Sequence, residues 1–118
     1  MAVVDYFKNA KDFTVYEAGQ VIFDEGQSGD KMYAVKEGIV DVVHNNRVLE
    51  SIEAGAFFGE MALVDSAPRS AKAVAQTDCK IVVVDKAHFL FLVQETPTFA
   101  LQVMHIMANR LRVMNELV

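Results

Sequence analysis

Short apolar runs separated by turn residues fill the chain from about residue 12 to residue 85, and this rhythm constrains the fold more than any other feature. The runs are rich in β-branched and aromatic residues, which favour strands. Asn45 and Asn46 predict a hairpin turn, because asparagine tolerates positive φ. The runs lie at residues 13–15, 21–23, 32–35, 39–43, 48–52, 71–75 and 80–84. This spacing predicts a mainly β fold, a jelly roll or small barrel.

Helical segments flank the predicted β region. Residues 1–9 predict a short amphipathic helix. Asp85 is expected to cap a short helix, and Thr96 followed by Pro97 predicts the start of a second one. The second helix should run to about residue 118, a length of roughly 30 Å at about 1.5 Å per residue.

Two apolar stripes mark this long C-terminal helix. The first has coiled-coil spacing and comprises Ala100, Met104, Met107, Leu111, Met114 and Val118. The second comprises Phe99, Val103, Ile106, Val113 and Leu117, and Arg110 interrupts it. One stripe is expected to pack on the chain's own β region and the other on the same helix of a second copy, giving a homodimer. The alternative is that both stripes lie in the core of one monomer.

Length, charge and cysteine usage bound the class of protein. A chain of 118 residues makes one domain, here 1–118, and its net charge of −5 argues against nucleic-acid binding. The single cysteine, Cys79, excludes an intramolecular disulfide and favours a reducing compartment. We find no apolar run long enough to span a membrane and no signal peptide, so the sequence predicts a cytoplasmic protein without membrane partners.

The segment 57–71 carries the candidate chemistry. Gly59 lets a ligand approach the backbone before a helix-compatible run, whose first amides have no partner inside a helix. Arg69 and Ser70 supply donors suited to a phosphate. Glu60 would repel a phosphate, so we expect it to accept hydrogen bonds from a neutral hydroxyl. The alternative is that Arg69 and Glu60 form an ordinary surface ion pair.

The same segment resembles a known family. Phe-Gly-Glu-Met-Ala-Leu, followed by Pro-Arg-Ser-Ala, is similar to the phosphate-binding cassette of cyclic nucleotide-binding domains. The glycines at 19, 26, 29, 38 and 55 match that family's turns, and the chain looks closest to the sensor domains of bacterial catabolite activator-like proteins. The resemblance implies an eight-stranded β-roll over about 12–85, with a short N-terminal helix, a cassette helix and C-terminal helices over about 86–118.

The resemblance also implies residue roles. Arg69, Ser70, Ala71 and the amides of Met61 and Ala62 would hold the cyclic phosphate, and Gly59 and Glu60 would hold the ribose. The base would lie against Leu49 and Ala73, with Met114 and Asn115 standing where the catabolite activator type has small hydroxyl side chains. No metal or other cofactor is implied. The chain ends at Val118, where transcription factors of this type continue into a DNA-binding domain.

These observations predict a regulatory, non-catalytic domain that binds a cyclic purine nucleotide, with cAMP the first choice and cGMP the second. Ligand is expected to reposition the C-terminal helix. The domain would be either a stand-alone sensor or the sensor of a larger protein. Three alternatives stay open: a related sensor of a non-nucleotide ligand, a cyclic-phosphate hydrolase, and a structural dimerisation module with a vestigial pocket.

Overall fold

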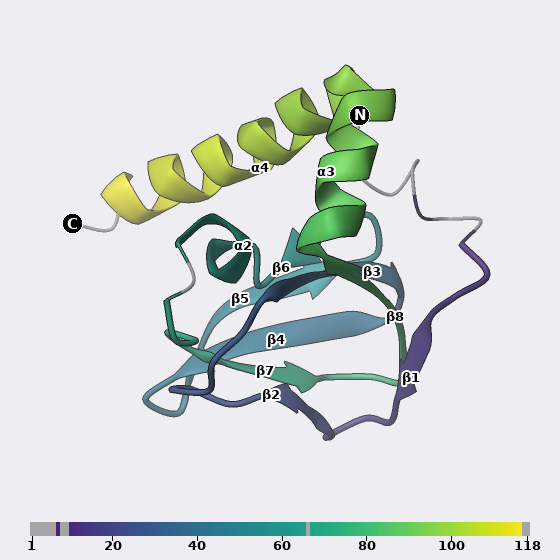
Figure 1. The fold of residues 1–118 in the computed structure, drawn as a ribbon. Helices are drawn as coiled ribbons and strands as arrows, with labels where there is room; N and C mark the ends of the chain where they lie inside the picture. Colours follow the sequence, from purple (N-terminus) through teal and green to yellow (C-terminus); the bar gives the residue numbers. More distant parts are fainter. Residues whose placement is uncertain (1–6, 8–9, 66, 117–118) are drawn as a thin grey trace.

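The computed structural model describes residue 7 and residues 10–65 and 67–116. In these residues the chain forms eight strands and three helices (Figure 1). The strands are β1 (Thr14–Tyr16), β2 (Val21–Phe23), β3 (Lys31–Glu37), β4 (Ile39–His44), β5 (Arg47–Glu53), β6 (Phe57–Phe58), β7 (Lys72–Ala75) and β8 (Cys79–Asp85). The helices are α2 (Met61–Asp65), α3 (Lys86–Glu95) and α4 (Pro97–Glu116).

The strands form two antiparallel four-stranded sheets. One sheet has the order β1-β8-β3-β6, and we call it the helix-side sheet because α3 and α4 lie over it. The other has the order β2-β7-β4-β5, and we call it the outer sheet. The mainly β fold predicted from the strand pattern and the eight strands implied by the family resemblance are confirmed. The seven predicted runs do not include the two-residue strand β6, whose phenylalanines belong to the segment predicted as the cassette.

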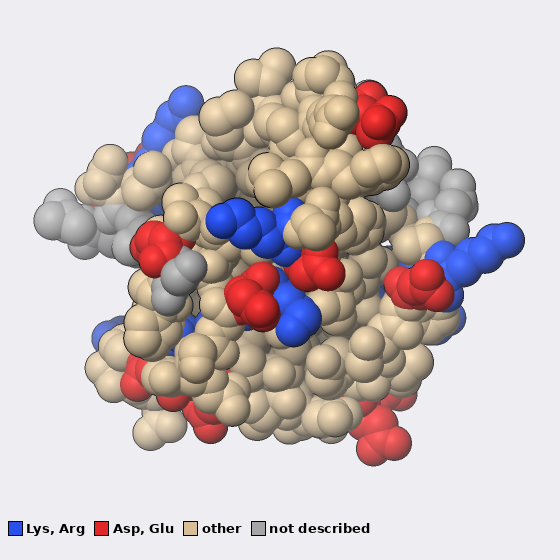
Figure 2. Space-filling model, viewed as in Figure 1, with Lys and Arg blue, Asp and Glu red and all other residues tan. Residues whose placement is uncertain are grey.

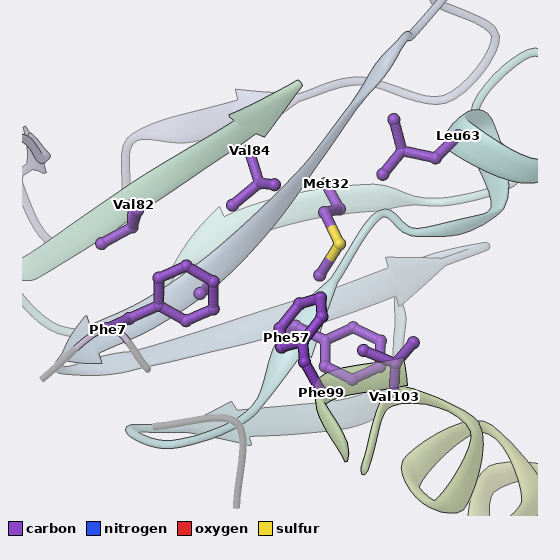
Figure 3. Packing of buried hydrophobic residues seen from close by; sticks show 9 residues of the cluster. Phe7, Met32, Phe57, Leu63, Val82, Val84, Phe99 and Val103 are labelled. Carbon is purple, nitrogen blue, oxygen red and sulfur yellow. The ribbon is translucent and has the colours of Figure 1, made fainter. Parts of the chain in front are cut away.

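Two buried clusters hold the layers together. Val40, Ile52 and Ile81 are fully buried members of the cluster between the sheets. Met32, Phe57 and Phe99 belong to the cluster between the helix-side sheet and the helices (Figure 3). Burying a large apolar side chain contributes about 1.5–3 kcal/mol, so the second cluster anchors the first turn of α4 to the β-roll.

The helix starts follow the sequence signals. Asp85 caps α3 by accepting a hydrogen bond of 2.8 Å from the backbone N–H of His88, and α4 begins at Pro97. Asn45 and Asn46 adopt φ values of 53° and 61°, as the predicted hairpin requires. The N-terminal helix predicted for residues 1–9 lies outside the described residues, apart from Phe7. This residue packs in the cluster between the helix-side sheet and the helices.

The two stripes of α4 divide differently from the prediction. Phe99 and Val103 are buried against the β-roll, as expected for one stripe. Met107 was assigned to the other stripe, but it packs against the same cluster. The exposed apolar row is formed by Leu101, Met104 and Leu111. Val113 belongs to the predicted second stripe, but the structure leaves it exposed.

No helix in the described part of the chain is long and apolar enough to cross a membrane.

Candidate ligand-binding site

A row of four neighbouring residues crosses the outer sheet. Phe23 pairs with Ala73, Ala73 with Val42, and Val42 with Glu50. Cross-strand partners share a face of a sheet, and Ala73, fully buried, belongs to the cluster between the sheets. The row therefore forms one inner floor, with an aromatic ring at one end and a carboxylate at the other.

Arg69 lies at the aromatic end of this floor. Its side chain is fixed by two backbone carbonyls, because Nη1 donates to the oxygen of Gly59 at 2.7 Å and Nη2 to the oxygen of Lys31 at 2.8 Å. The guanidinium carbon lies 4.2 Å from the centre of the Phe23 ring. These contacts hold the guanidinium between the cassette and the loop before β3.

Within the described residues, the charge of Arg69 has no carboxylate partner. The residue is only 7% exposed, and the ion pairs of the described residues involve Lys31, Lys80, His44 and Arg110 but not Arg69. A buried cation that faces carbonyl dipoles and the aromatic rings of Phe23 and Tyr33 is costly, because these groups replace bulk water incompletely. The site is therefore electrostatically complementary to an anion.

Two glycines make room for this guanidinium. A Cβ at Gly29 would lie 2.4 Å from Nε of Arg69, and one at Gly59 would lie 2.9 Å from its Nη1. Gly59 also has φ of 77°, a conformation that side-chain-bearing residues rarely adopt. Gly29, Lys31 and Tyr33 line a hollow of about 490 Å³ beside the arginine. Both glycines are thus required by the position of Arg69.

The remaining predicted phosphate residues surround the start of α2. Met61 is 53% exposed and Ala62 is buried, and their amides belong to the first turn, which has no intrahelical acceptors. Ser70 is exposed and Ala71 is buried. The structure thus brings the arginine and Gly59 into direct contact, whereas the hydroxyl of Ser70 has no hydrogen bond to another described residue.

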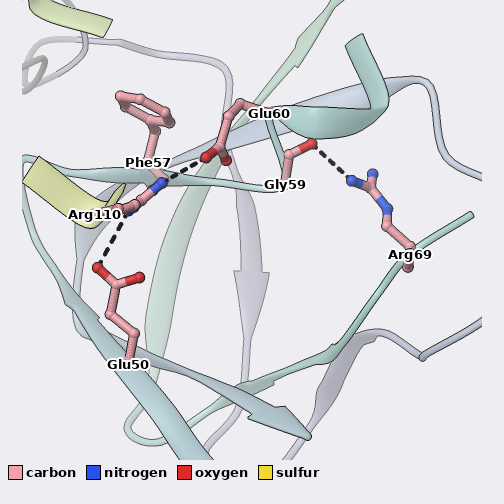
Figure 4. Close-up of polar contacts among 6 residues, drawn as sticks. All are labelled: Glu50, Phe57, Gly59, Glu60, Arg69 and Arg110. Atoms are coloured by element: carbon pink, nitrogen blue, oxygen red, sulfur yellow. Dashed lines mark hydrogen bonds and ion pairs between the residues drawn. The ribbon is translucent and has the colours of Figure 1, made fainter. Parts of the chain in front are cut away.

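Glu60 lies at the other end of the cassette and binds α4. Its Oε1 accepts from Nη1 of Arg110 at 2.7 Å, and Oε1 of Glu50 accepts from Nε of Arg110 at 3.2 Å (Figure 4). Nη2 of Arg110 donates to the carbonyl of Phe57. The alternative of a surface ion pair between Arg69 and Glu60 is wrong, because each contacts a different partner. Figure 2, drawn in the same view as Figure 1, shows acidic and basic side chains side by side near the centre of the visible face.

The predicted base residues occupy three different environments. Ala73 lies in the floor, and Leu49 is 62% exposed beside it, at the irregular pairing between β4 and β5. Asn115 is exposed in the last turns of α4. The side chain of Met114 lies outside the described residues.

Sequence reasoning missed Arg110 and Glu50. The signal for Arg110 was present, because it is the one residue that interrupts the second apolar stripe of α4. A long cation within an apolar helix face indicates a partner across the interface. Its partners could not be identified from spacing, because Glu60 and Glu50 are 50 and 60 residues away in sequence.

Comparison with known proteins identifies the family. The sequence model of the family described as the cyclic nucleotide-binding domain matches residues 13–96 of this chain. The chain therefore belongs to the cyclic nucleotide-binding domain family, as the cassette resemblance predicted.

The chain is similar to the cAMP-dependent protein kinase regulatory subunit of Eremothecium gossypii, with 36% identity over 81 residues that cover 69% of this chain and 18% of that protein. It is also similar to the cGMP-dependent protein kinase of Plasmodium berghei, with 32% identity over 93 residues that cover 78% and 10%. The chain thus spans less than a fifth of either relative.

Among solved structures, the catabolite activator protein of Thermus thermophilus superposes with a TM-score of 0.79 and 31% identity. The match covers 96% of this chain and 54% of that protein. It includes nearly all of the β-roll and helices described above.

Proposed function

We propose that this domain binds a cyclic purine nucleotide as a regulatory, non-catalytic module, with cAMP the first choice and cGMP the second. The observation that carries the proposal is the buried guanidinium of Arg69, which no carboxylate in the described part of the chain neutralises. The single negative charge of a cyclic phosphate matches this single cation without a metal. The names of the two similar proteins support this choice, because one is the regulatory subunit of a cAMP-dependent protein kinase and the other is a cGMP-dependent protein kinase.

The ligand would lie along the floor between the cassette and the outer sheet. Arg69, Ser70, Ala71 and the amides of Met61 and Ala62 would hold the phosphate, Gly59 and Glu60 the ribose, and Leu49, Ala73, Met114 and Asn115 the base. The contact from Arg69 to Gly59 supports placing phosphate and ribose next to each other.

The same arrangement supports repositioning of α4 as the response to ligand. A ribose hydroxyl that donates to Glu60 would compete with Arg110 for that carboxylate. Since Arg110 belongs to α4, a change in this bond would reach the helix. A ligand shifts such an equilibrium only by its differential affinity for the two helix positions.

We further propose that α4 joins two copies in a homodimer. Leu101, Met104 and Leu111 are 64%, 55% and 61% exposed and lie three and seven residues apart, which is coiled-coil spacing. Met104→Glu should convert the dimer to a monomer in sedimentation experiments, and Gln94→Glu on α3 serves as the matched control. A wild-type monomer at high concentration would contradict the dimer.

We propose that residues 1–118 form one domain. We also propose that neither nucleic acid nor a membrane is a direct partner of this domain. The net charge of −5 supports the exclusion of nucleic acid, because nonspecific nucleic-acid binding depends on a basic face. The proposed cytoplasmic location agrees with the buried, free thiol of Cys79.

Calorimetric titration with cAMP and cGMP tests the central proposal. We expect saturable binding of at least one nucleotide, with the nucleotide recovered intact by chromatography. Absence of binding of both would refute the proposed function. Conversion of the ligand to the open 5′-monophosphate would show that the domain is a hydrolase instead.

A further inference from the structure

The segment that connects β2 to β3, residues 24–30, holds the main chain of Arg69, and we call it the arginine loop. The backbone N–H of Arg69 donates to the carbonyl of Gln27 at 2.8 Å, and the carbonyl of Arg69 accepts from the N–H of Gly26 at 2.8 Å. The same loop supplies Gly29, which lies directly against the guanidinium. The position of this loop therefore determines the position of the guanidinium.

The arginine loop is closed on itself and then bonded to a second strand of the outer sheet. The side-chain oxygen of Gln27 accepts from the N–H of Asp24 at 2.7 Å, and Oδ1 of Asp24 accepts from the N–H of Glu25 at 2.9 Å. Oε1 of Glu25 lies 2.5 Å from Nδ1 of His44. Since His44 is the last residue of β4, this pair connects the loop to the β4–β5 hairpin.

The β4–β5 hairpin gives the pair a firm support. Asn45 and Asn46 form its turn, and β4 is paired on both sides, with β5 and with β7. In the arginine loop, by contrast, every residue except Gly29 is exposed. Exposed segments with few buried contacts open more easily than paired strands. A bond between the two therefore restrains the loop rather than the strand.

The arrangement of Arg69 is sensitive to such a restraint. Its guanidinium is buried without a carboxylate partner in the described residues, so an arrangement in which it turns toward water competes with the observed one. In the observed arrangement the guanidinium bonds Gly59 of the cassette. The apparent affinity of a ligand falls with the fraction of molecules in the arrangement that binds it. A contact that favours the observed arrangement therefore raises the affinity.

We propose that His44 is a positioning residue for the phosphate site. When its imidazole is protonated, it forms an ion pair with Glu25 that holds the arginine loop, and through the loop Arg69, in the arrangement that binds an anion. Histidine is the side chain whose charge normally changes between about pH 5 and 8. Affinity for the nucleotide is highest when His44 is charged, so it falls as the pH rises. The inference rests on the proposed function, because it takes Arg69 as the phosphate ligand.

Other charged groups lie near this pair. Arg47 is opposite His44 in the hairpin, Lys72 pairs with the preceding residue of β4, and Asp24 precedes Glu25 in the loop. All three stay in place in the variants below, so a difference between two pH profiles belongs to the replaced side chain. The side chains of His44 and Glu25 are 44% and 51% exposed, and ion pairs of this exposure contribute modestly.

The test is the affinity for whichever of cAMP and cGMP binds more tightly, measured by calorimetry at about pH 6 and about pH 8. The wild-type protein should bind about two- to fivefold more tightly at the lower pH, as an exposed ion pair provides. His44→Gln cannot become charged, so it should match the wild-type protein at the higher pH and show no pH dependence. His44→Lys carries a cation at both pH values and should bind tightly at both.

The chain has three histidines, and the other two provide matched controls. His88→Gln and His105→Gln remove the same group from exposed positions on α3 and α4. The cap of α3 is kept, because it uses the backbone N–H of His88. Both variants should retain the wild-type pH profile. Loss of the pH dependence in either of them would assign it to a group outside the arginine loop and overturn the inference.

The remaining outcomes separate this inference from the proposed function. A wild-type affinity that is the same at both pH values, or an unchanged pH profile in His44→Gln, would overturn the role of His44 and leave nucleotide binding intact. Weak binding by His44→Lys at both pH values would do so as well, because its charge is present throughout. Absence of binding of both nucleotides to the wild-type protein would overturn the proposed function and this inference together.

Discussion

The two arginines of the site, Arg69 and Arg110, differ in what surrounds their charge. Arg69 is 7% exposed, and within the described residues its guanidinium donates only to the carbonyls of Gly59 and Lys31. The Arg110 side chain, 18% exposed, contacts the carboxylates of Glu60 at 2.7 Å and Glu50 at 3.2 Å. One cation is therefore left to an external anion, and the other is neutralised within the fold.

In the proposed function, this difference separates the binding of the nucleotide from its coupling to α4. An anion at Arg69 adds a charge interaction that the ligand-free protein lacks, so the gain appears mainly as affinity. A ligand at Arg110 and Glu60 must instead replace bonds that already exist. Its net gain there is smaller, and the displaced bonds are those that connect α4 to the cassette.

Replacing Arg69 should give the largest effect. Arg69→Met is expected to weaken cAMP binding by about 3 kcal/mol or more, because a charge-assisted pair is lost and the phosphate is left unpaired. The unfolding free energy without ligand should change by less than about 1 kcal/mol, because a costly buried charge is removed together with its hydrogen bonds. Calorimetry and urea denaturation measure the two quantities. Unchanged affinity would refute the phosphate assignment.

Alanine at Gly59 should have the next largest effect on binding. Its Cβ would lie 2.9 Å from Nη1 of Arg69 and the backbone has φ of 77°, so we expect a loss of about 2 kcal/mol in affinity and in stability. Gly19→Ala is the control, because Gly19 has φ of 88° with nothing within 4 Å of the added Cβ. It should lose stability alone. Equal affinity losses in both variants would show that strain, rather than displacement of Arg69, is responsible.

The sequence predicted local structure better than it predicted contacts. Asn45 and Asn46, Asp85 and Pro97 act within a few residues, and their turn, cap and helix start are confirmed. The cassette was recognised because its functional groups are close together in sequence.

Contacts between distant segments could not be predicted in the same way. Met107 has the spacing of a seam residue, but it is partly buried and packs against the cluster between the helix-side sheet and the helices. The partners of Arg110 depend on where that helix crosses the cassette, which the heptad pattern does not specify. Strand β6, only two residues long, is defined by pairing with Tyr33 and Ala34 rather than by its own pattern.

Replacing Arg110 tests the arginine whose charge is neutralised by carboxylates within the fold. Arg110→Met leaves Glu60, whose side chain is 13% exposed, without its cation, so we expect the unfolding free energy to fall by about 1–2 kcal/mol. The bond to Glu50 contributes less, because that carboxylate is more exposed. Amide hydrogen exchange in α4 should become faster.

Arg112→Met provides the control for Arg110. Arg112 is exposed, and within the described residues its side chain donates only to Oδ1 of Asn109 on its own helix, at 2.8 Å. Its replacement should leave stability and exchange in α4 within error of the wild-type values. If Arg110→Met were equally silent, the network of Arg110 with Glu60 and Glu50 would not connect α4 to the cassette.

The smallest effect is expected where neither arginine takes part. Leu49 is 62% exposed beside the floor, and a bound base would cover part of its side chain. Leu49→Ala should therefore weaken cAMP binding by about 1 kcal/mol and leave stability without ligand nearly unchanged, because little apolar surface is buried there before binding. Val48→Ala, at the adjacent and 57% exposed position, should change neither quantity. A loss at Leu49 as large as that at Arg69 would mean that apolar cover, and not the unpaired cation, supplies most of the affinity.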